Sequence, residues 1–468
     1  MTAKALILAA GAGTRMKSDK PKVVHEVLGK PLVRWVVDAA HDAGIEDVVT
    51  VLGHMSEKVA PFVEGDTKIA IQTQQLGTGD AVNAGREAFT QADGSIAEGS
   101  LMVLSGDCPL ITPETIQALI AKREETGAAV VVLTMHMDDP FGYGRIVREG
   151  EAVVRIVEQK DANEQEAAIT ECNSGFYCFD APALFDALSR VSNDNAQGEY
   201  YLTDVLEICR NDGREVLALQ TADAEEAMGV NSRVQLAQAT HAMQHRINNR
   251  HMMAGVTMWD PESTFIGPDV EIAQDVELWP QTYLLGTTKV GSHSVIGPNT
   301  RLTDTQVGCG ARVDETVAIE AQIDDAAECG PRAYLRPGTH LCEGAKAGTH
   351  VEIKKSTIGK GSKVPHLSYI GDTTMGENVN IGAGSITCNY DGVNKNHTEI
   401  GDNVFVGSDT MMVAPVNIGA GAIIGASSCI TRDVAPNALA LERADQREIE
   451  GWAAKHMAKL KAKKEAGK

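Results

Sequence analysis

A glycine-rich loop near the amino terminus has the composition of a phosphate site. An apolar run, Ala5–Ala10, leads directly into Gly11-Ala-Gly13-Thr-Arg15, and Lys22 follows within a Lys-Pro-Lys segment. Glycines let the backbone turn so that its N–H groups face an anion, and Arg15 and Lys22 could neutralise phosphate charge. The loop lacks the third glycine of a dinucleotide fingerprint and the Gly-Lys-Ser/Thr of a Walker loop. A glycine loop after a strand can also be a simple tight turn, but the two cations favour a phosphate site of another kind.

A carboxylate follows a second apolar run. Leu101–Leu104 leads into Ser105-Gly106-Asp107. In open α/β sheets, ligands bind beyond the carboxyl ends of the strands, so Asp107 is expected to project into such a site. A carboxylate there can hold Mg²⁺ against substrate phosphates. An aspartate after a strand is often only a turn former, and the pairing with the glycine loop favours the metal role.

A second group of polar or bulky side chains stands out in the carboxyl-terminal part, which is otherwise rich in small and aliphatic residues. Its members are Arg336, Lys354, His366, Tyr369, Asn380, Asn389 and Tyr390. Any one of them could be an ordinary solvated surface residue. A loop within the same region, residues 387–399, interrupts the sequence repeat that surrounds it. Such insertions often lie on a binding face.

That repeat places an aliphatic residue at every sixth position. The first unbroken run is Ile266, Ile272, Leu278, Leu284, Val290, Ile296 and Leu302, and the register returns after short slips as far as Ile430. Helices repeat near 3.6 residues and strands near 2, so neither explains the period. A hexapeptide period is typical of a parallel β-helix, in which short strands wind into triangular coils around an aliphatic core.

The amino-terminal part has a different pattern, in which apolar runs alternate with helix-like stretches. The expected strands are Ala5–Ala10, Val48–Leu52, Leu101–Leu104 and Ala128–Leu133, and the expected helices include Pro31–Ala43 and Pro113–Thr126. This alternation predicts a mostly parallel, doubly wound α/β sheet. Between the two parts, Ser232–Met253 has helical spacing without Gly or Pro, and we expect a connecting helix there.

Composition excludes several classes of function. The net charge of −22 argues against a nucleic-acid partner, because phosphate-backbone binding needs a basic face. Nine scattered cysteines without a CxxC pair or zinc spacing indicate reduced thiols in a cytoplasmic protein. Neither a signal peptide nor a membrane-spanning run is evident, so no membrane insertion is expected. The basic stretch Lys455–Lys468 is expected to be a solvated, frayed terminus.

Several motifs, taken together in order and spacing, resemble one bacterial enzyme family. They are residues 6–22 (LILAAGAGTRMKSDKPK), 74–81 (QQLGTGDA), 104–111 (LSGDCPLI), 142–147 (GYGRIV), 156–162 (IVEQKDA), 173–177 (NSGFY), 229–231 (GVN) and 380–392 (NIGAGSITCNYDG). The chain resembles the bifunctional N-acetylglucosamine-1-phosphate uridylyltransferase / glucosamine-1-phosphate acetyltransferases over nearly its whole length. The resemblance implies a nucleotidyltransferase (Rossmann-like) domain at 1–230, a linker helix at 231–253 and a left-handed β-helix acetyltransferase domain at 254–468. It also implies synthesis of the cell-wall precursor UDP-N-acetylglucosamine in two steps.

The resemblance implies residues for the first site. There, N-acetylglucosamine 1-phosphate would attack the α-phosphorus of UTP and release pyrophosphate, which needs alignment and charge neutralisation more than a protein nucleophile. Arg15 and Lys22 would be the catalytic cations, and Asp107 and Asn231 would hold Mg²⁺. The UTP-binding residues would be Leu8, Ala9, Ala10, Gly11, Lys22, Gln72, Gly77 and Thr78. The sugar-phosphate-binding residues would be Ser105, Gly106, Asp107, Gly144, Glu158, Asn173 and Asn231. Ala12 stands where many members have a lysine.

For the second site the resemblance implies that His366 takes the proton from the sugar amine as the amine attacks acetyl-CoA. Histidine suits this task because its ordinary titration lies near neutral pH. Glucosamine 1-phosphate would be bound by Arg336, Lys354, Tyr369 and Asn380. Acetyl-CoA would be bound by Ala383, Asn389, Tyr390, Ser408, Ala426 and Arg443. The family also implies a homotrimer with acetyl sites between subunits. Pro365, beside the histidine, differs from the family pattern.

Two other functions remain open from the sequence. In the first, the chain is a nucleotidyltransferase whose solenoid is only an oligomerising or regulatory scaffold, and such a scaffold has no need of His366 or of the Asn389-Tyr390 loop. In the second, the chain is a phosphosugar-binding module without enzymatic activity. Release of free CoA thiol and of pyrophosphate distinguishes the three possibilities.

Overall fold

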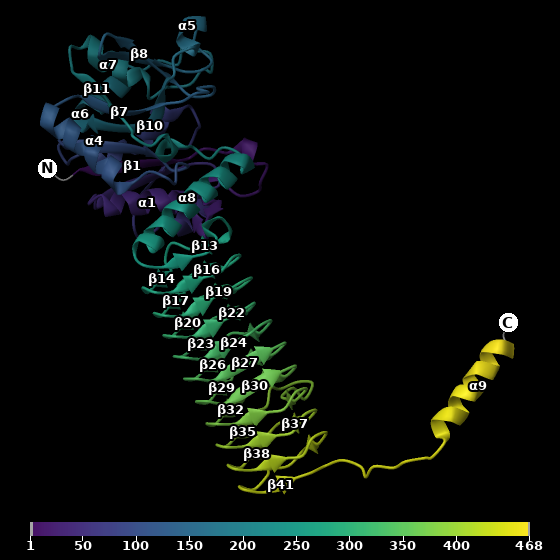
Figure 1. The fold of residues 1–468 in the computed structure, drawn as a ribbon. Coiled ribbons are helices and arrows are strands. Elements are labelled where there is room, and N and C mark those ends of the chain that lie inside the picture. Colours follow the sequence, from purple (N-terminus) through teal and green to yellow (C-terminus); the bar gives the residue numbers. More distant parts are fainter. Residues whose placement is uncertain (1–2, 467–468) are drawn as a thin grey trace. The chain divides into compact units, whose positions relative to one another are not determined.

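A computed structural model describes residues 3–466 and separates into two units. The first comprises residues 1–250 and 265–268, and the second comprises residues 251–264 and 269–468 (Figure 1). Among the described residues no helix is long and apolar enough to cross a membrane. The cysteines in the described part of the chain are all free thiols, as the sequence predicts.

The first unit is built around a twisted sheet. Its strands are β1 (Lys4–Ala9), β4 (Asp47–Leu52), β5 (Lys68–Ile71), β6 (Ser100–Ser105), β7 (Val130–His136), β10 (Glu171–Asp180) and β11 (Val216–Gln220). They lie in the order β11-β7-β10-β6-β1-β4-β5. Only β10 runs antiparallel to its neighbours on this path. A hairpin of β8 (Arg145–Glu149) and β9 (Ala152–Val157) joins the sheet at β10. The predicted mostly parallel α/β sheet is confirmed.

Helices cover both faces of this sheet, which explains why its strands read as unbroken apolar runs. In β1, Ala5 and Ile7 belong to one buried cluster, while Leu6 between them belongs to the other. The main helices are α1 (Leu32–Asp42), α3 (Thr78–Ala84), α4 (Pro113–Thr126), α6 (Ala181–Leu188) and α7 (Asp204–Asn211). The bounds of α4 follow from its ends, because the Thr112 side chain caps it and Gly127 closes it at a φ of 69°.

The predicted connecting helix is present as α8 (Arg233–Met253). Met243 and Ile247, four residues apart, are both buried on it. The Arg246 guanidinium donates to the carbonyl of Leu110 at 2.8 Å, which ties the helix to the first unit. The range predicted from the helical period, Ser232–Met253, therefore differs from the observed helix by one residue.

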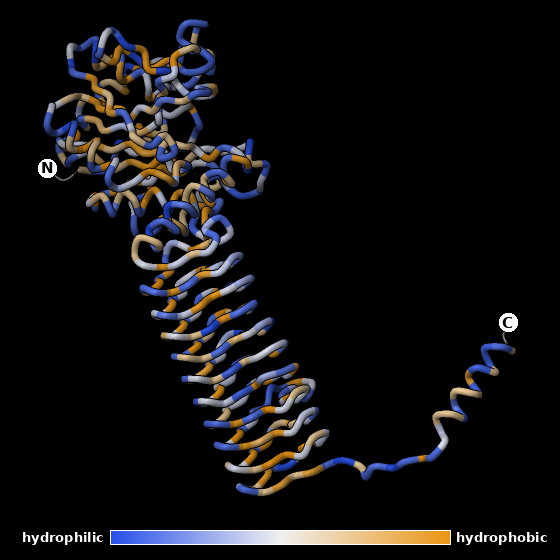
Figure 2. Tube along the Cα trace, viewed as in Figure 1, coloured by the Kyte–Doolittle hydropathy of each residue, from blue (hydrophilic) through white to orange (hydrophobic). Residues whose placement is uncertain are grey.

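The second unit is a parallel β-helix with three strands in each coil. Its first sheet runs from β12 (Thr257–Met258) to β41 (Leu439–Ala440), its second includes β16 (Tyr283–Leu285) to β40 (Cys429–Ile430), and its third runs from β14 (Glu271–Ile272) to β38 (Val416–Ile418). Pairing is parallel from coil to coil in each sheet. Figure 2 shows hydrophobic residues recurring along every coil. The aliphatic positions point inward, and Leu278, Leu284 and Ile296 are completely buried. The left-handed hexapeptide solenoid predicted for this part is the fold observed.

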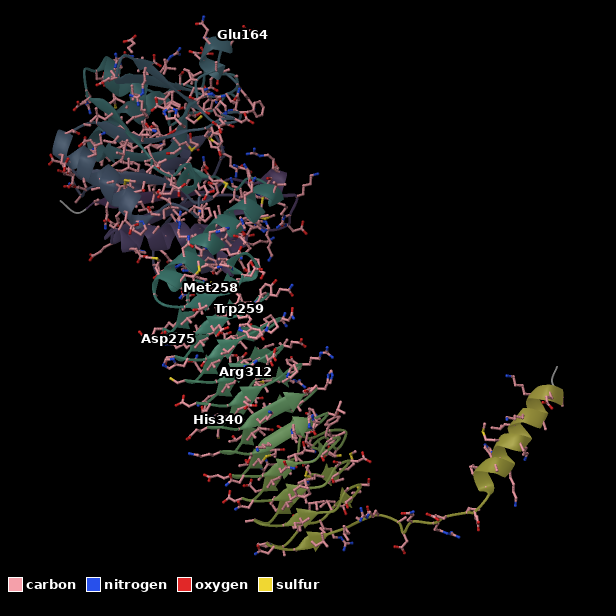
Figure 3. The ribbon with its side chains drawn as sticks, viewed as in Figure 1. Glu164, Met258, Trp259, Asp275, Arg312 and His340 are labelled. Carbon is pink, nitrogen blue, oxygen red and sulfur yellow. The ribbon has the colours of Figure 1, made fainter. Side chains whose placement is uncertain are left out.

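Aromatic side chains lie on the outside of the coils nearest the start of the solenoid. Trp259 and Trp279 stack with ring centroids 5.0 Å apart, and the Arg312 guanidinium lies 5.8 Å from the Trp279 centroid (Figure 3). Trp259 is nevertheless largely exposed. The stacked Trp259, Trp279 and Arg312 side chains therefore lie on the outer surface, and the core of the solenoid stays aliphatic.

The expectation of a frayed basic terminus is wrong for residues 455–466, and residues 467–468 lie outside the described part of the chain. Trp452–Ala466 forms a helix, α9, although its described residues are exposed as expected. The segment is rich in Ala and Lys, which are strong helix formers, and it contains no Gly or Pro between Trp452 and Ala466. Charge repulsion among its lysines is therefore outweighed by intrinsic propensity.

Candidate functional sites

The carboxyl edge of the sheet gathers the predicted residues of the first site. Leu8 on β1 pairs with Ser105 on the adjacent, parallel β6, so the glycine loop and Asp107 leave the sheet side by side. Gly106 N–H donates to the Leu8 carbonyl at 2.9 Å and locks the two strand ends together. Two strands further along, Gln72 follows β5 at the same edge, and its N–H donates to the Leu52 carbonyl at 2.8 Å.

These strand ends surround a cavity of about 350 Å³. The predicted residues that line it are Leu8, Ala9, Ala10, Gly11, Lys22, Gln72, Gly77, Thr78, Ser105 and Asp107. Four lining residues that sequence reasoning missed are Val23, Gln75, Ala81 and Glu199. Arg15 does not line it: the residue lies on the short 3-10 helix η1 (Thr14–Met16), is exposed, and has no hydrogen bond or ion pair within residues 3–466.

A cation links the two residues predicted to bind the metal. The Lys22 ammonium pairs with Asp107 Oδ2 and also donates to Asn231 Oδ1 at 2.9 Å. Lys22 and Asp107 are mostly buried, with side-chain exposures of 15% and 16%. The Val230 N–H donates to the Asp107 carbonyl at 2.9 Å, which holds the Asn231 segment against the end of β6. A carboxylate oxygen and an amide oxygen thus converge on one positive centre.

Gly13 makes this arrangement possible. Its φ is +64°, and a side-chain carbon added to it would lie 2.5 Å from Lys22 Cβ. Any other residue would push Lys22 away from Asp107. The second glycine of the loop therefore serves the position of the lysine as well as the turn itself.

Three of the residues predicted to bind UTP, Gln72, Gly77 and Thr78, form a hydrogen-bonded corner. Gln72 donates through Nε2 to the Gly77 carbonyl at 3.2 Å and to Asp80 Oδ2 at 2.8 Å. The Thr78 hydroxyl accepts the Leu202 N–H at 3.1 Å. The missed residue Gln75 donates to the Ala10 carbonyl at 2.7 Å and so connects this corner to the glycine loop.

Three of the residues predicted to bind the sugar phosphate, Gly144, Glu158 and Asn173, lie close together at β10. The Asn173 N–H donates to the Gly144 carbonyl at 2.9 Å, and a side-chain carbon on Gly144 would come within 3.6 Å of Glu158 Oε1. A bulge in β10 between Asn173 and Tyr177 turns this segment toward the carboxyl edge, where Gly175 approaches Ser105. Burial, reinforced by nearby acidic side chains, raises the pKa of Glu158, whose Oε1 accepts a hydrogen bond from the Thr203 hydroxyl at 3.5 Å.

The second predicted site is distributed over two corners of the solenoid. Arg336 and Lys354 follow β25 (Tyr334–Leu335) and end β28 (Glu352–Lys354), and the Arg336 N–H donates to the Ile353 carbonyl at 2.9 Å. The two cations therefore stack on successive coils at the end of the second sheet. Arg336 also forms an ion pair with Glu352 at 2.9 Å.

Tyr369 begins the next strand of that sheet, β31 (Tyr369–Gly371), and its hydroxyl lies near Asn389, whose acidic partner Asp372 sequence reasoning missed. Asn389 Nδ2 lies 3.5 Å from the Tyr369 hydroxyl and 2.5 Å from Asp372 Oδ2. Asn389 is buried, whereas Tyr390 is exposed, with the Lys395 ammonium 4.0 Å from its ring centroid. The structure thus brings Tyr369 together with the inserted loop predicted from the break in the repeat, and Asp372 orients that loop.

His366 ends β30 (Lys363–His366), on the first sheet, and begins a column of predicted residues. Its carbonyl accepts the Gly384 N–H, the Ala383 carbonyl accepts the Asp409 N–H at 2.7 Å, and the Ser408 carbonyl accepts the Ser427 N–H at 2.8 Å. Arg443 then donates to the Ala426 carbonyl at 2.9 Å. His366, Ala383, Ser408 and Ala426 therefore occupy equivalent corners of successive coils.

The remaining predicted residues lie close to this column. Asn380 pairs with Lys363 on β30, so it shares the first sheet with His366. The His366 side chain is exposed and has no hydrogen bond or ion pair to any residue from 3 to 466. His366 lies at the corner between the first and second sheets, whereas Arg336 and Lys354 lie at the corner between the second and third.

Comparison with known proteins matches both halves. Residues 5–207 match the MobA-like NTP transferase domain, and residues 397–432 match the bacterial transferase hexapeptide (six repeats). Among solved structures, a UDP-glucose pyrophosphorylase complexed with UDP-glucose is 20% identical, covering 53% of this chain and 100% of that chain, with a TM-score of 0.43.

Whole-length relatives are much more similar. A protein of Streptomyces coelicolor is 51% identical over 97% of this chain and 94% of its own length, and one of Syntrophotalea carbinolica is 50% identical over 98% of both. A protein of Syntrophomonas wolfei is 48% identical over 96% of this chain and 99% of its own. Each of these is named Bifunctional protein GlmU. Because the likeness spans both the α/β unit and the solenoid, the chain belongs to the family of bifunctional GlmU proteins.

Proposed function

We propose that the chain makes UDP-N-acetylglucosamine in two steps, one in each half. The solenoid transfers the acetyl group of acetyl-CoA to glucosamine 1-phosphate. Residues 1–230 then transfer the uridylyl group of UTP to the N-acetylated product, with release of pyrophosphate. The observation that carries the second step is the convergence of Lys22, Asp107 and Asn231, of which Lys22 and Asp107 line the cavity beside the glycine loop.

Each part of the first site has a role in this reaction. The glycine loop offers backbone N–H groups to the UTP phosphates, and the corner around Gln72 takes the uracil. Gly144, Glu158 and Asn173 take the sugar phosphate, whose oxygen must be aligned with the α-phosphorus. The Lys22 ammonium neutralises negative charge that develops on the phosphates.

The donor set at this cavity also fits Mg²⁺. Asp107 Oδ2 and Asn231 Oδ1 already converge on one cation, the Lys22 ammonium, and hard oxygen donors are those that Mg²⁺ prefers. Bound Mg²⁺ would neutralise phosphate charge and help to orient the substrate. Lys22 would then be free to turn toward the phosphates.

In the solenoid, Arg336 and Lys354 bind the phosphate of glucosamine 1-phosphate, and Tyr369 and Asn380 orient the sugar. His366 accepts the proton that the amine loses as it attacks the thioester carbonyl, and CoA leaves as the thiol. The column Ala383-Ser408-Ala426 presents small side chains along which the extended cofactor can lie, with Asn389, Tyr390 and Arg443 beside it. Since the cations and His366 occupy different corners of one solenoid, we also propose that homotrimers bring these corners of neighbouring subunits together.

A single reaction mixture tests the whole proposal. Purified chain receives glucosamine 1-phosphate, acetyl-CoA, UTP and Mg²⁺, and the products are followed by free thiol, pyrophosphate and UDP-sugar. All three products are expected. A scaffold solenoid would release no CoA thiol and would give pyrophosphate only with N-acetylglucosamine 1-phosphate, and a binding module would give neither product.

Lys22→Ala is expected to lower the turnover of uridylyl transfer by about 10- to 1000-fold, since electrostatic contacts to a transition state have that magnitude. Arg15→Ala should have a smaller effect, because that side chain is exposed and its charge is screened. Steady-state kinetics with varied UTP measure both effects. Lys17→Ala, an exposed lysine beside the same loop, is the matched control and should be neutral. Unchanged UTP kinetics in both Lys22→Ala and Arg15→Ala would contradict the phosphate-loop assignment.

Separate fragments should retain separate activities. A fragment ending at Arg250 is expected to keep uridylyl transfer and to be monomeric, because the α/β sheet has its own buried core. The fragment from His251 should keep acetyl transfer and form trimers, since stacked coils bury their core without the other unit. Light scattering measures the oligomeric states. An active but monomeric solenoid would refute an acetyl site shared between subunits.

A further inference from the structure

Three side chains with metal-binding donor atoms converge on the outer face of the third sheet. Strands β23 (Gln322–Ile323) and β26 (His340–Leu341) are adjacent and parallel, and Gln322 pairs with His340. Leu341 is fully buried in the core, so the residues on either side of it, His340 and Cys342, point outward. Asp324 follows β23 and lies beside Cys342 on the neighbouring coil, with its N–H donating to the Leu341 carbonyl at 2.8 Å. Figure 3 shows His340 on the outside of the coils.

The donor atoms are already at near-binding separations. His340 Nε2 lies 2.7 Å from Asp324 Oδ2 and 3.9 Å from Cys342 Sγ, and the donor atoms of the three residues all lie within 4.8 Å of one another. Ordinary Zn–N, Zn–O and Zn–S bond lengths in a tetrahedral site place pairs of ligand atoms about 3.4 to 3.6 Å apart. Small side-chain rotations therefore suffice to admit the ion. We propose that Asp324, His340 and Cys342 bind a thiophilic divalent cation of the Zn²⁺ type.

The sequence of this face supports a built site. The position after the core aliphatic residue of the third sheet is Ala273, Gly291, Gly308, Asp324, Cys342, Gly359, Gly376, Gly401 and Gly419 in successive coils. At the coils where glycine stands, an added side-chain carbon would strike the next coil: for Gly291 it would lie 2.6 Å from the Gly308 backbone. Functional side chains replace these small residues only at Asp324 and Cys342, on neighbouring coils beside His340.

Neighbouring groups complete the site. Gln322 Nε2 donates to Asp324 Oδ1 at 2.8 Å, which orients the carboxylate and leaves Oδ2 for the ion, as outer partners of metal ligands commonly do. His340 and Asp324 side chains are 32% and 31% exposed, so an ion and a water ligand can reach them. An adjoining cavity of about 400 Å³ is lined in part by Asp325 and Glu343, whose charge favours an approaching cation.

Binding requires proton release. Burial, with the charges of Asp324 and Glu377, raises the pKa of the Cys342 thiol, so the metal must displace the thiol proton to bind the thiolate. Nε2 of His340 becomes a ligand when the ring proton lies on Nδ1. Because the ligands come from two coils, the bound ion would bridge them.

Cobalt(II) provides the test, because a thiolate ligand gives it a sulfur-to-metal charge-transfer absorption. The full chain is stripped with a chelator, supplied with Mg²⁺ for the first site and titrated with Co²⁺. One Co²⁺ per chain is expected to give the thiolate band, and Zn²⁺ should displace it. Cobalt held only by the oxygen donors of the first site lacks this band, so failure of one assignment is distinguishable from failure of the other.

Variants assign the ligands. Cys342→Ser should abolish the band, and His340→Ala should lower Zn²⁺ affinity in a chelator competition by more than about 100-fold, since even an outer-shell partner is worth about 10- to 100-fold. Asp324→Asn keeps the shape of the side chain and should weaken binding without disturbing the fold. Cys309→Ser, at an exposed cysteine outside the cluster, is the matched control and should keep the band. A band that is absent from the unmodified chain, persists in Cys342→Ser or disappears in Cys309→Ser overturns the proposal.

Discussion

Asp107→Ala is expected to abolish uridylyl transfer while acetyl transfer stays near its normal rate. The physical reason is that the variant removes the only carboxylate among the proposed Mg²⁺ ligands and leaves the Lys22 ammonium paired with the neutral Asn231 alone. Divalent-metal activation should disappear with it. The measurements are pyrophosphate release and CoA thiol release on the same preparation, which makes the solenoid an internal control for correct folding.

Asp107→Asn sharpens this experiment. The amide keeps an oxygen donor but loses the negative charge, so the variant should retain weak activity that rises with Mg²⁺ concentration, whereas Asp107→Ala should not respond. Asp42→Ala, at an exposed carboxylate that ends α1, is the surface control and should behave as the unmodified chain. Pyrophosphate release from Asp107→Ala at a near-normal rate would show that the metal assignment is wrong.

Local sequence patterns predict the elements well because those patterns are set by burial. In the α/β sheet, both faces are covered by helices, so strands such as β1 and β6 must be apolar throughout. In the solenoid, each strand contributes one inward aliphatic residue, such as Ile296, to the shared core. The glycine loop and Asp107 were predictable as neighbours for a similar reason, since both follow strands of one parallel sheet.

Contacts between distant segments could not be predicted in this way. Glu199 reaches the first cavity because the Tyr200 N–H donates to the Leu76 carbonyl and the Tyr200 carbonyl accepts the Gly79 N–H, both at 2.8 Å. No local pattern encodes that pairing. Arg15 shows the converse, because it belongs to the predicted loop and yet the 3-10 turn places it outside the cavity lining.

The cysteine pattern shows the same limit. Zinc motifs are recognised when ligands are close in sequence, but in a solenoid the neighbours of a residue lie one coil away. Asp324 and His340 are 16 residues apart in the sequence, and yet Asp324 Oδ2 lies 2.7 Å from His340 Nε2. Coil register must be known before such a cluster can be found.

His366→Ala is expected to lower the turnover of acetyl transfer by about 10²- to 10⁴-fold, the usual contribution of general acid–base catalysis. The ring is exposed at the corner of its coil and, within residues 3–466, has no partner that would compete for a proton. Because the proposed contact is with the sugar amine, the Michaelis constant for acetyl-CoA should change little. Uridylyl transfer should be unaffected, and His293→Ala, at an exposed histidine of a distant coil, should leave both activities unchanged.

Asn380→Ala distinguishes proton transfer from substrate positioning. A residue that orients glucosamine 1-phosphate should mainly raise the Michaelis constant for that substrate, whereas a base should mainly lower turnover. The comparison is preferable to a pH profile, because protonation of the sugar amine also slows the reaction in acid. If His366→Ala acted only on the affinity for glucosamine 1-phosphate, the histidine would be a binding residue. An ordered water at the same corner would then be the first candidate for the proton acceptor.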